Sequence, residues 1–380
     1  MVPTDLKSTF LQLIRLGIGT LKDAKISKDI DWESVEALAE KQGMLGVVYD
    51  GVIRLADSAE NVDPHAALDA ASQGIPAQGR NEEFPLVIKL RWMGKVMQGY
   101  EQQYLLYRKA VSDLGAWYHA HGYRMMLLKG LACGVNWPRP EHRPYGDIDI
   151  WLFGQQEAAD KEMFEEFKKF EGFKIDNSHH HHTVFQWQGF TVENHYDFLN
   201  VHHHKSNVEL EALLKEIADD GLQLTVYGLL PSANFNALFL LRHAMSHFAS
   251  AGMNLRQLLD WAFFVEKHGE EVDWDWLQGV LKKYGMLKMF NVMNAICVED
   301  LGFDCLPLTA YGLQLKERVL NDILSREFDE ATPKHVWKRV PFKYRRWKAN
   351  AWKHELCFSD SMKSAFWSGV KNHLMKPSSI

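Results

Sequence analysis

This chain of 380 residues has few cysteines, no long apolar run and only a small net charge. The four cysteines show no CxxC spacing, so the sequence predicts neither a disulfide framework nor a zinc knuckle. No apolar run approaches the roughly 18–20 residues that a membrane-spanning helix needs. The net charge of −6 argues against a protein that coats nucleic acid over its whole surface. The N-terminus has no signal-peptide core, which favours a cytoplasmic protein.

Apolar side chains are abundant, at 46% of the residues, which is enough for a large core in a chain of this length. Helical periodicity predicts an N-terminal helical region over 1–120, interrupted by a turn-rich loop or insert at 56–84. Short apolar runs predict strands within 121–215. The helical period then returns over 216–380. The expected organisation is therefore helices, a small unit with strands, and helices again.

An Asp-x-Asp pair lies on a strand candidate that begins at residue 147. The carboxylates of Asp147 and Asp149 are expected on one face, roughly 6–7 Å apart along the strand, because alternate side chains share a face. Like charges so placed repel unless a cation lies between them. Magnesium, which carboxylates and substrate phosphates bind together, is the usual cation. Two other Asp-x-Asp pairs, which contain Asp31 and Asp273, precede tryptophan and are expected to cap helices.

A strand–glycine–helix element precedes this pair. The apolar run 124–128 fits a buried strand, and Gly130 follows it. A residue without Cβ lets backbone N–H groups approach a phosphate at the start of the next helix. Lys129 could reach the same phosphate as a point charge. The alternative interpretation is a plain strand-to-helix turn.

If the Asp147–Asp149 pair is catalytic, a third carboxylate is expected, because an acceptor hydroxyl would need a base. Glu193 lies on a predicted strand over 190–196, where its side chain shares a face with that of His195. Asp197, at the end of the same strand, is the competing candidate. The hypothesis requires the three carboxylates to converge, and a lysine or an aromatic ring between them would argue against bound ions.

These motifs together resemble the nucleotidyltransferase superfamily of the DNA polymerase β type, and within it the bacterial uncharacterised nucleotidyltransferase family. The resemblance spans roughly residues 30–300 and implies an α+β fold. A small mixed-sheet nucleotidyltransferase core at 121–215 would be flanked by N- and C-terminal helical regions. The residues that would hold two Mg²⁺ ions are Asp147, Asp149 and Glu193. The residues that would contact the nucleotide are Lys129, Gly130, Arg143 and His195.

The resemblance implies an enzyme that moves a nucleoside monophosphate from an NTP, expected to be ATP, to an acceptor hydroxyl and releases pyrophosphate. Glu193 would deprotonate the acceptor, and the same carboxylates would serve a sugar, an antibiotic, a protein side chain, a tRNA end or another nucleotide. The superfamily has Gly-Ser or Gly-Gly where this chain has Gly130-Leu131. This departure keeps a second hypothesis open, a weakly active or inactive nucleotide-binding sensor of the same fold.

Several further residues have a structural and a functional interpretation. The histidine run 179–182 predicts a solvated loop beside the site, with a transition-metal site as the alternative, since imidazole suits Zn, Ni or Cu. His243 and His247 are four residues apart on an apolar helix. That geometry can bind a metal, but a packed core pair is the first expectation. Arg256 and Asp260 have the same spacing and are expected to form an intrahelical ion pair, with a substrate role for Arg256 as the alternative.

The segment 333–376 is strongly basic, with 11 Lys and Arg against 2 Asp and Glu. It also contains four tryptophans. Basic residues interleaved with aromatic ones favour contact with RNA or another polyanion, with an anionic membrane surface, or with the acidic remainder of the same protein. Packing against the protein itself is the first expectation. A peripheral protein that binds a polyanion or a membrane surface is the third functional hypothesis.

Overall fold

The computed structural model describes residues 2–24, 26, 30–60, 86–179, 181–202, 204–250, 252–307, 313–328, 330, 333 and 335–363. Three helices begin the chain: α1 (Thr4–Ile18), α2 (Trp32–Gln42) and α3 (Leu45–Glu60). Because α3 continues to Glu60, the loop predicted from residue 56 is wrong for its first five residues. The rest of that prediction lies outside the described residues. The capping predictions are confirmed, because Asp31 accepts a hydrogen bond from the Ser34 backbone and Asp273 accepts one from the Trp276 backbone.

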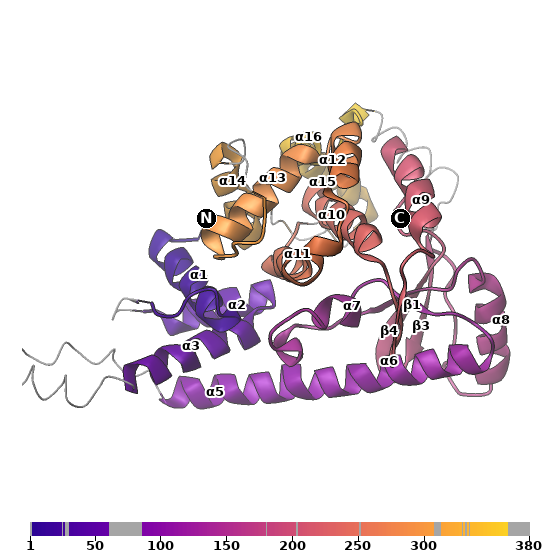
Figure 1. Cartoon of the computed structure of the whole chain (residues 1–380), viewed down its shortest axis with the longest axis horizontal. Coiled ribbons are helices and arrows are strands. Elements are labelled where there is room, and N and C mark those ends of the chain that lie inside the picture. The colour runs from indigo at the N-terminus through magenta and orange to yellow at the C-terminus, as the bar shows by residue number, and fades with distance from the viewer. Residues whose placement is uncertain are drawn as a thin grey trace, which may run out of the picture.

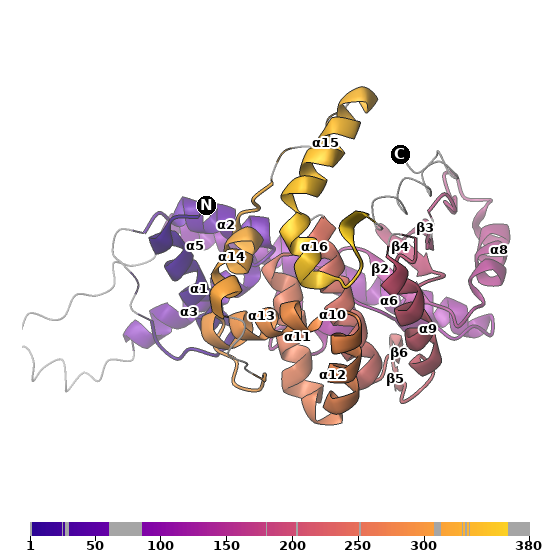
Figure 2. The same ribbon diagram turned by 90° about the horizontal axis from the view of Figure 1, so that it is seen from above.

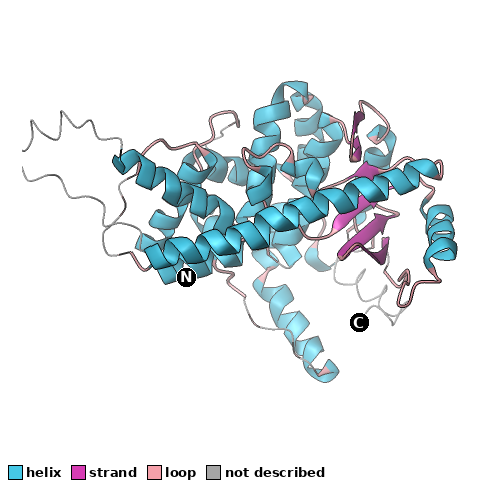
Figure 3. Ribbon diagram, turned by 90° about the horizontal axis from the view of Figure 1, so that it is seen from below, coloured by secondary structure: helices cyan, strands magenta, loops and turns pink. Residues whose placement is uncertain are grey.

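One long helical run passes beneath the rest of the molecule (Figure 1). It consists of α5 (Leu86–Val96), the π-helical turn η1 (Met97–Glu101) and α6 (Gln102–Ala120). Figure 3 shows this run crossing the N-terminal helices at one end and the sheet at the other. The part in α6 carries buried side chains, among them Tyr107 and Leu114, that pack against the sheet.

The sheet has six strands in the order β3-β4-β2-β1-β6-β5. The strands are β1 (Met126–Leu127), β2 (Ile148–Trp151), β3 (His182–Trp187), β4 (Phe190–His195), β5 (Gln223–Thr225) and β6 (Gly228–Leu230). The β2–β4 and β1–β6 pairs are parallel, and the other three pairs are antiparallel. The expected α+β fold with a small mixed sheet and helical flanks is therefore confirmed.

Two details of the strand prediction are wrong. The β5–β6 hairpin lies in a stretch where only helix was expected, and β6 extends the sheet by pairing with β1. The strand predicted over 173–175 does not form, and only Asp176 pairs there, with Val184. The turn at Gln188 and Gly189 is as expected. Both residues have positive φ, as a two-residue hairpin turn requires.

Short helices connect the strands, and a larger helical region follows them. The connecting elements are α7 (Leu131–Gly134), η2 (Pro140–His142), α8 (Gln156–Phe167) and α9 (Lys205–Ile217). The later helices are α10 (Ala233–Ser250), α11 (Leu255–His268), η3 (Gly269–Glu271), α12 (Trp274–Lys283), α13 (Leu287–Ala295), η4 (Ile296–Asp300), α14 (Leu313–Leu324), α15 (Val336–Ala349) and α16 (Ala351–Cys357). No helix among the described residues is long and apolar enough to cross a membrane.

The packing forms two hydrophobic cores. The first joins α1–α3 to α10–α14 and α16, so both ends of the chain contribute to it. The second lies between α6, α8 and the sheet. The basic helix α15 projects away from both cores (Figure 2). The sheet therefore has α6 on one side, and its other side carries the polar residues described next.

Candidate active site

The register of the sheet brings the predicted acidic residues together. β2 and β4 run parallel, with Asp149 opposite Glu193 and Trp151 opposite His195. Asp149, Glu193 and His195 share one face because their positions alternate along paired strands. Asp147 lies one residue before β2. The side chain of Asp147 is exposed, but its partial loss of solvent and the nearby charges of Glu193 and Asp149 raise its pKa.

The side chain of Asp149 is buried between two basic groups. Its Oδ1 atom lies 2.7 Å from Lys129 Nζ and 3.1 Å from His195 Nε2. Burial alone would raise the pKa of Asp149, but Lys129 and His195 outweigh burial and hold that pKa well below its usual range. Asp149 is therefore a carboxylate at neutral pH, and Lys129 contacts one oxygen of this carboxylate, which was expected to bind a metal ion.

His195 also links Asp149 to the third predicted carboxylate. Its Nε2 atom lies 3.5 Å from Glu193 Oε2. The hydrogen bond from His195 lowers the pKa of Glu193 against the effect of burial. Burial lowers the pKa of His195, but its bonds to Asp149 and Glu193 outweigh burial and raise it overall. Glu193 thus points toward Asp149, as the hypothesis of converging carboxylates requires.

Gly130 occupies a place that no side chain fits. Its φ is +61°, and a Cβ atom there would lie 2.3 Å from the hydroxyl of Tyr107. That hydroxyl donates a hydrogen bond to the backbone oxygen of Asp147, at 2.9 Å. Gly130 therefore allows α6 to hold the start of β2 in place. The predicted strand–glycine–helix element is present, but α7 is a single turn of four residues.

Arg143 lies in a buried ion pair. Its Nε and Nη2 atoms each donate to Asp260, both at 2.8 Å, and Nη1 donates to the Pro144 backbone. The Trp137 indole N–H also donates to Asp260. Each guanidinium nitrogen of Arg143 already contacts protein, so the geometry supports a structural role, and the nucleotide contact stays a prediction. The expected pairing of Arg256 with Asp260 is wrong, because Asp260 binds Arg143.

Three basic side chains from α10 and α11 border the acidic cluster, and the sequence interpretation gave them mainly structural roles. The rings of His243 and His247 pack edge to face, with 4.4 Å between their centroids. Burial lowers the pKa of both, and the charge of Lys129 lowers both further, which places them beside the acidic cluster. Arg256 Nε is buried with no hydrogen-bond partner among the described residues. In the sequence, the signal for these three residues was their spacing on otherwise apolar helices.

The histidine run continues into β3 and does not form the solvated loop that was expected. His182 is only 6% exposed and lies opposite His195 in the β3–β4 pair. His179, in contrast, is exposed. Burial lowers the pKa of His181 to about 3 and that of His182 to about 4. The run therefore begins at the surface and ends beside Glu193.

The donor atoms fit a divalent cation. One group with ligand atoms within 4.8 Å of one another is Asp149, Glu193 and His195, and a second is His181, His182 and His195. Carboxylate oxygens suit magnesium, which one or two carboxylates hold together with substrate phosphates. An ion at Asp149 would compete with Lys129 for Oδ1.

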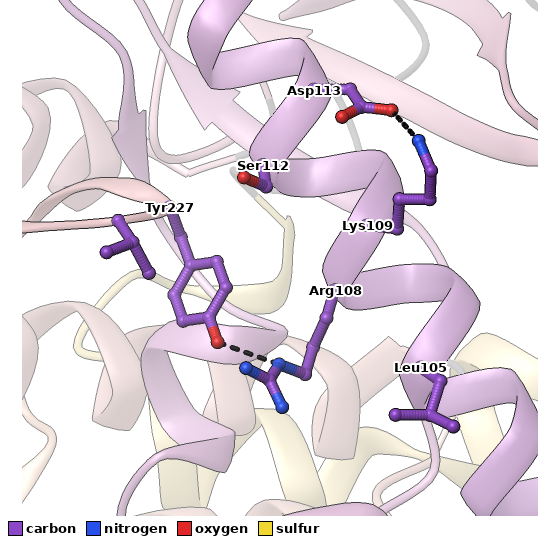
Figure 4. Close-up of a pocket in the computed structure, with 7 residues that line it drawn as sticks. Leu105, Arg108, Lys109, Ser112, Asp113 and Tyr227 are labelled. Carbon is purple, nitrogen blue, oxygen red and sulfur yellow. Dashed lines mark hydrogen bonds and ion pairs between the residues drawn. The ribbon is translucent and has the colours of Figure 1, made fainter.

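A separate hollow lies away from this cluster (Figure 4). It is formed by α6 and the β5–β6 turn, and Arg108 Nε donates to the Tyr227 hydroxyl across it at 2.7 Å. Lys109 and Asp113 form an ion pair beside them. No predicted site residue lines this hollow.

Comparison with known proteins identifies the family. The model of the uncharacterised nucleotidyltransferase family matches residues 28–302, and the chain belongs to this family. The match spans the described sheet and every residue of the acidic cluster. No curated protein and no solved structure matches the chain.

Proposed function

We propose that the protein transfers a nucleoside monophosphate from an NTP, with ATP as the expected donor, to an acceptor hydroxyl and releases pyrophosphate. The observation that carries the proposal is the in-register placement of Asp149 opposite Glu193, with His195 between their carboxylates. Membership of a nucleotidyltransferase family supports the reaction class. The acceptor is defined only as a group that bears a hydroxyl.

Each residue of the cluster has a distinct role in this proposal. Asp147, Asp149 and Glu193 hold two Mg²⁺ ions, which when bound neutralise charge at the reacting phosphate. Glu193 accepts the proton of the acceptor hydroxyl, and its lowered pKa keeps it ionised at neutral pH. Such proton transfer contributes on the order of 10²–10⁴ in rate. Lys129 and Gly130 face the phosphates, and His195 fixes the two carboxylates beside it.

Lys129 favours a second candidate function. Its ammonium lies 2.7 Å from Asp149 Oδ1, where the transferase hypothesis requires a metal ion. If this ion pair persists when nucleotide binds, Asp149 cannot ligate through that oxygen. The protein would then be a nucleotide-binding sensor without turnover, which also agrees with Leu131 after Gly130.

Turnover and binding assays separate the two functions. The variant Asp147→Asn changes an exposed side chain, and Asp275→Asn is its matched control because Asp275 is an exposed member of another Asp-x-Asp pair. We expect wild type and Asp275→Asn to release pyrophosphate from ATP with Mg²⁺ and an acceptor panel of sugars, proteins and RNA. We expect Asp147→Asn to lose at least about 100-fold of this activity. Equal activity of Asp147→Asn and wild type would refute the transferase assignment. Calorimetric binding of a non-hydrolysable ATP analogue without any pyrophosphate release would favour the sensor.

Helix α15 supports a further proposal about surface contact. Its sequence VWKRVPFKYRRWKA has six basic residues and no acidic one. Trp337 is 91% exposed and Tyr344 is 55% exposed on this projecting helix (Figure 2). An exposed basic helix with aromatic residues fits an anionic surface. In flotation with anionic liposomes, we expect wild type to float with the liposomes and the double variant Trp337→Ala with Arg345→Glu to remain behind. Equal flotation of the two proteins would contradict a membrane contact.

A further inference from the structure

Three histidines meet at the edge of the acidic cluster. They lie on the side of the sheet away from β1, the strand that precedes Lys129. His182 and His195 are direct cross-strand neighbours in the β3–β4 pair. The backbone oxygen of His181 accepts hydrogen bonds from Tyr196 and Asp197, which continues the pairing past the end of β3. One ring nitrogen from each of the three histidines lies within 4.8 Å of the others. Hydrogen bonds between paired backbone segments thus fix the positions of the three histidine Cα atoms.

One nitrogen in this group is buried and lacks a hydrogen bond. His182 Nδ1 is inaccessible to solvent and has no hydrogen-bond partner among the described residues. A buried polar atom without a partner is costly, so it points to a ligand. Glu193 Oε2 lies 3.9 Å from His182 Nδ1 and 3.5 Å from His195 Nε2. The 3.9 Å separation is too long for a hydrogen bond, and the 3.5 Å separation is long for one. His195 Nε2 also contacts Asp149 Oδ1 at 3.1 Å. One cation bound by all three atoms would therefore satisfy His182 Nδ1 and would replace that contact of His195.

We propose that His181, His182 and His195 bind one transition-metal ion, with Zn²⁺ as the best match, and that Glu193 supplies the fourth ligand. Imidazole nitrogens select Zn²⁺ and related ions, whereas Mg²⁺ prefers oxygen ligands. Three nitrogens and one carboxylate complete the four-coordinate geometry of zinc sites. Nitrogen ligands lie about 2.0–2.1 Å from zinc and therefore roughly 3.4 Å from one another, so ring nitrogens that are up to 4.8 Å apart must approach by up to about 1.4 Å.

This site lies directly beside the proposed magnesium site, and the two share Glu193 and His195. Asp147 belongs only to the oxygen-rich side, and His181 and His182 belong only to the nitrogen-rich side. Zinc binding can therefore be measured without nucleotide, so its failure and the failure of the proposed transferase reaction are distinguishable. A bound zinc ion would hold the Glu193 carboxylate in a fixed orientation beside Asp149.

The test is calorimetric titration of the full chain with Zn²⁺ alone, after treatment with a chelator and dialysis. Visible absorption of bound Co²⁺ reports the geometry. We expect one saturable site per chain in wild type and a loss of about 100-fold or more in affinity for His182→Ala, since even outer-shell partners cost 10–100-fold. His181→Ala, outside β3, gives the same test if His182→Ala fails to fold.

Two controls decide which atoms bind the metal. His179→Ala removes an exposed histidine of the same run and should bind Zn²⁺ as wild type does. Asp147→Asn should also keep Zn²⁺ binding while it loses transferase activity. The proposal is overturned if wild type shows no saturable site. It is also overturned if His179→Ala loses as much affinity as His182→Ala, or if Asp147→Asn abolishes binding.

Discussion

The buried pair between Arg143 and Asp260 gives the sharpest prediction about the loop before Asp147. The two side chains are 5% and 9% exposed and are joined by two parallel N–H···O bonds of 2.8 Å. Replacing Asp260 with Leu leaves a buried guanidinium without its counter-charge. Replacing Arg143 with Met leaves a buried carboxylate that keeps the Trp137 N–H but loses its guanidinium partner.

The expected magnitudes follow from the burial of both partners. Removing one member of a buried ion pair costs about 3–5 kcal/mol, because the remaining charge stays uncompensated in the interior. Replacing both members by apolar residues of similar volume is often neutral or stabilising. We therefore expect each single variant to lose about 3–5 kcal/mol of unfolding free energy, and Arg143→Met with Asp260→Leu to regain most of it.

Urea unfolding followed by circular dichroism measures these free energies, and NTP titration of the double variant tests the role of Arg143. If the pair is structural, the double variant binds NTP with an affinity close to that of wild type. If Arg143 contacts phosphate, the double variant folds but binds NTP weakly. Single variants that each lose less than about 1 kcal/mol, the value of an exposed ion pair, would refute the structural reasoning.

The remaining predictions concern a glycine, a histidine and a second buried pair. Gly130→Ala should lower both stability and activity, because a Cβ atom would displace the Tyr107 hydroxyl that holds the Asp147 backbone. A variant that unfolds at the same temperature as wild type and turns over at the same rate would contradict this. Burial lowers the pKa of His142, but its hydrogen bond to Asp50 outweighs burial and raises the pKa overall. The contact therefore stabilises the fold fully at pH values below the pKa of His142 in the unfolded chain. This stabilisation is lost as the pH rises through the pKa of His142 in the folded protein. The stability difference between wild type and His142→Gln should be about 2 kcal/mol at pH 5.5 and should shrink toward pH 8, and a pH-independent difference in urea unfolding would exclude this charge effect. The Lys353–Asp322 pair is 2% and 0% exposed, so Asp322→Asn should cost about 3–5 kcal/mol of unfolding free energy, and a loss under 1 kcal/mol would contradict it.

Local sequence patterns predicted those parts of the site that depend on a two-residue period. Asp149 on β2 and the shared face of Glu193 and His195 on β4 needed only the alternation of side chains along a strand. The N-cap at Asp31 likewise follows from residue type and the three-residue spacing to Ser34. Each of these features involves residues near one another in the chain, so it could be argued without tertiary structure.

Features that depend on long-range packing were missed. Asp260 is 117 residues from Arg143, and four-residue spacing pointed to the wrong partner. The β5–β6 hairpin is short, and β6 is stabilised by its pairing with β1, about a hundred residues earlier in the chain. His247 and Arg256 border the acidic cluster only because the tertiary packing of the helical core brings α10 and α11 to it. Their four-residue spacing on apolar helices was a signal, but it fits a packed core pair equally well, so it could not place them at the site.

The contact between Lys129 and Asp149 follows from the same electrostatics that would draw magnesium to this site. Asp149 is buried near two other carboxylates, so a positive group must accompany it. Without nucleotide, Lys129 and His195 provide that charge from within the protein. A nucleoside triphosphate brings negative charge, to which the Lys129 ammonium can move. It also brings magnesium, which can replace Lys129 at Asp149. The contact therefore agrees with a transferase before substrate binds. The contact agrees with a sensor only if Lys129 remains on Asp149 after nucleotide binds. The position of the Lys129 ammonium group in the nucleotide complex is therefore the structural difference between the two proposed functions.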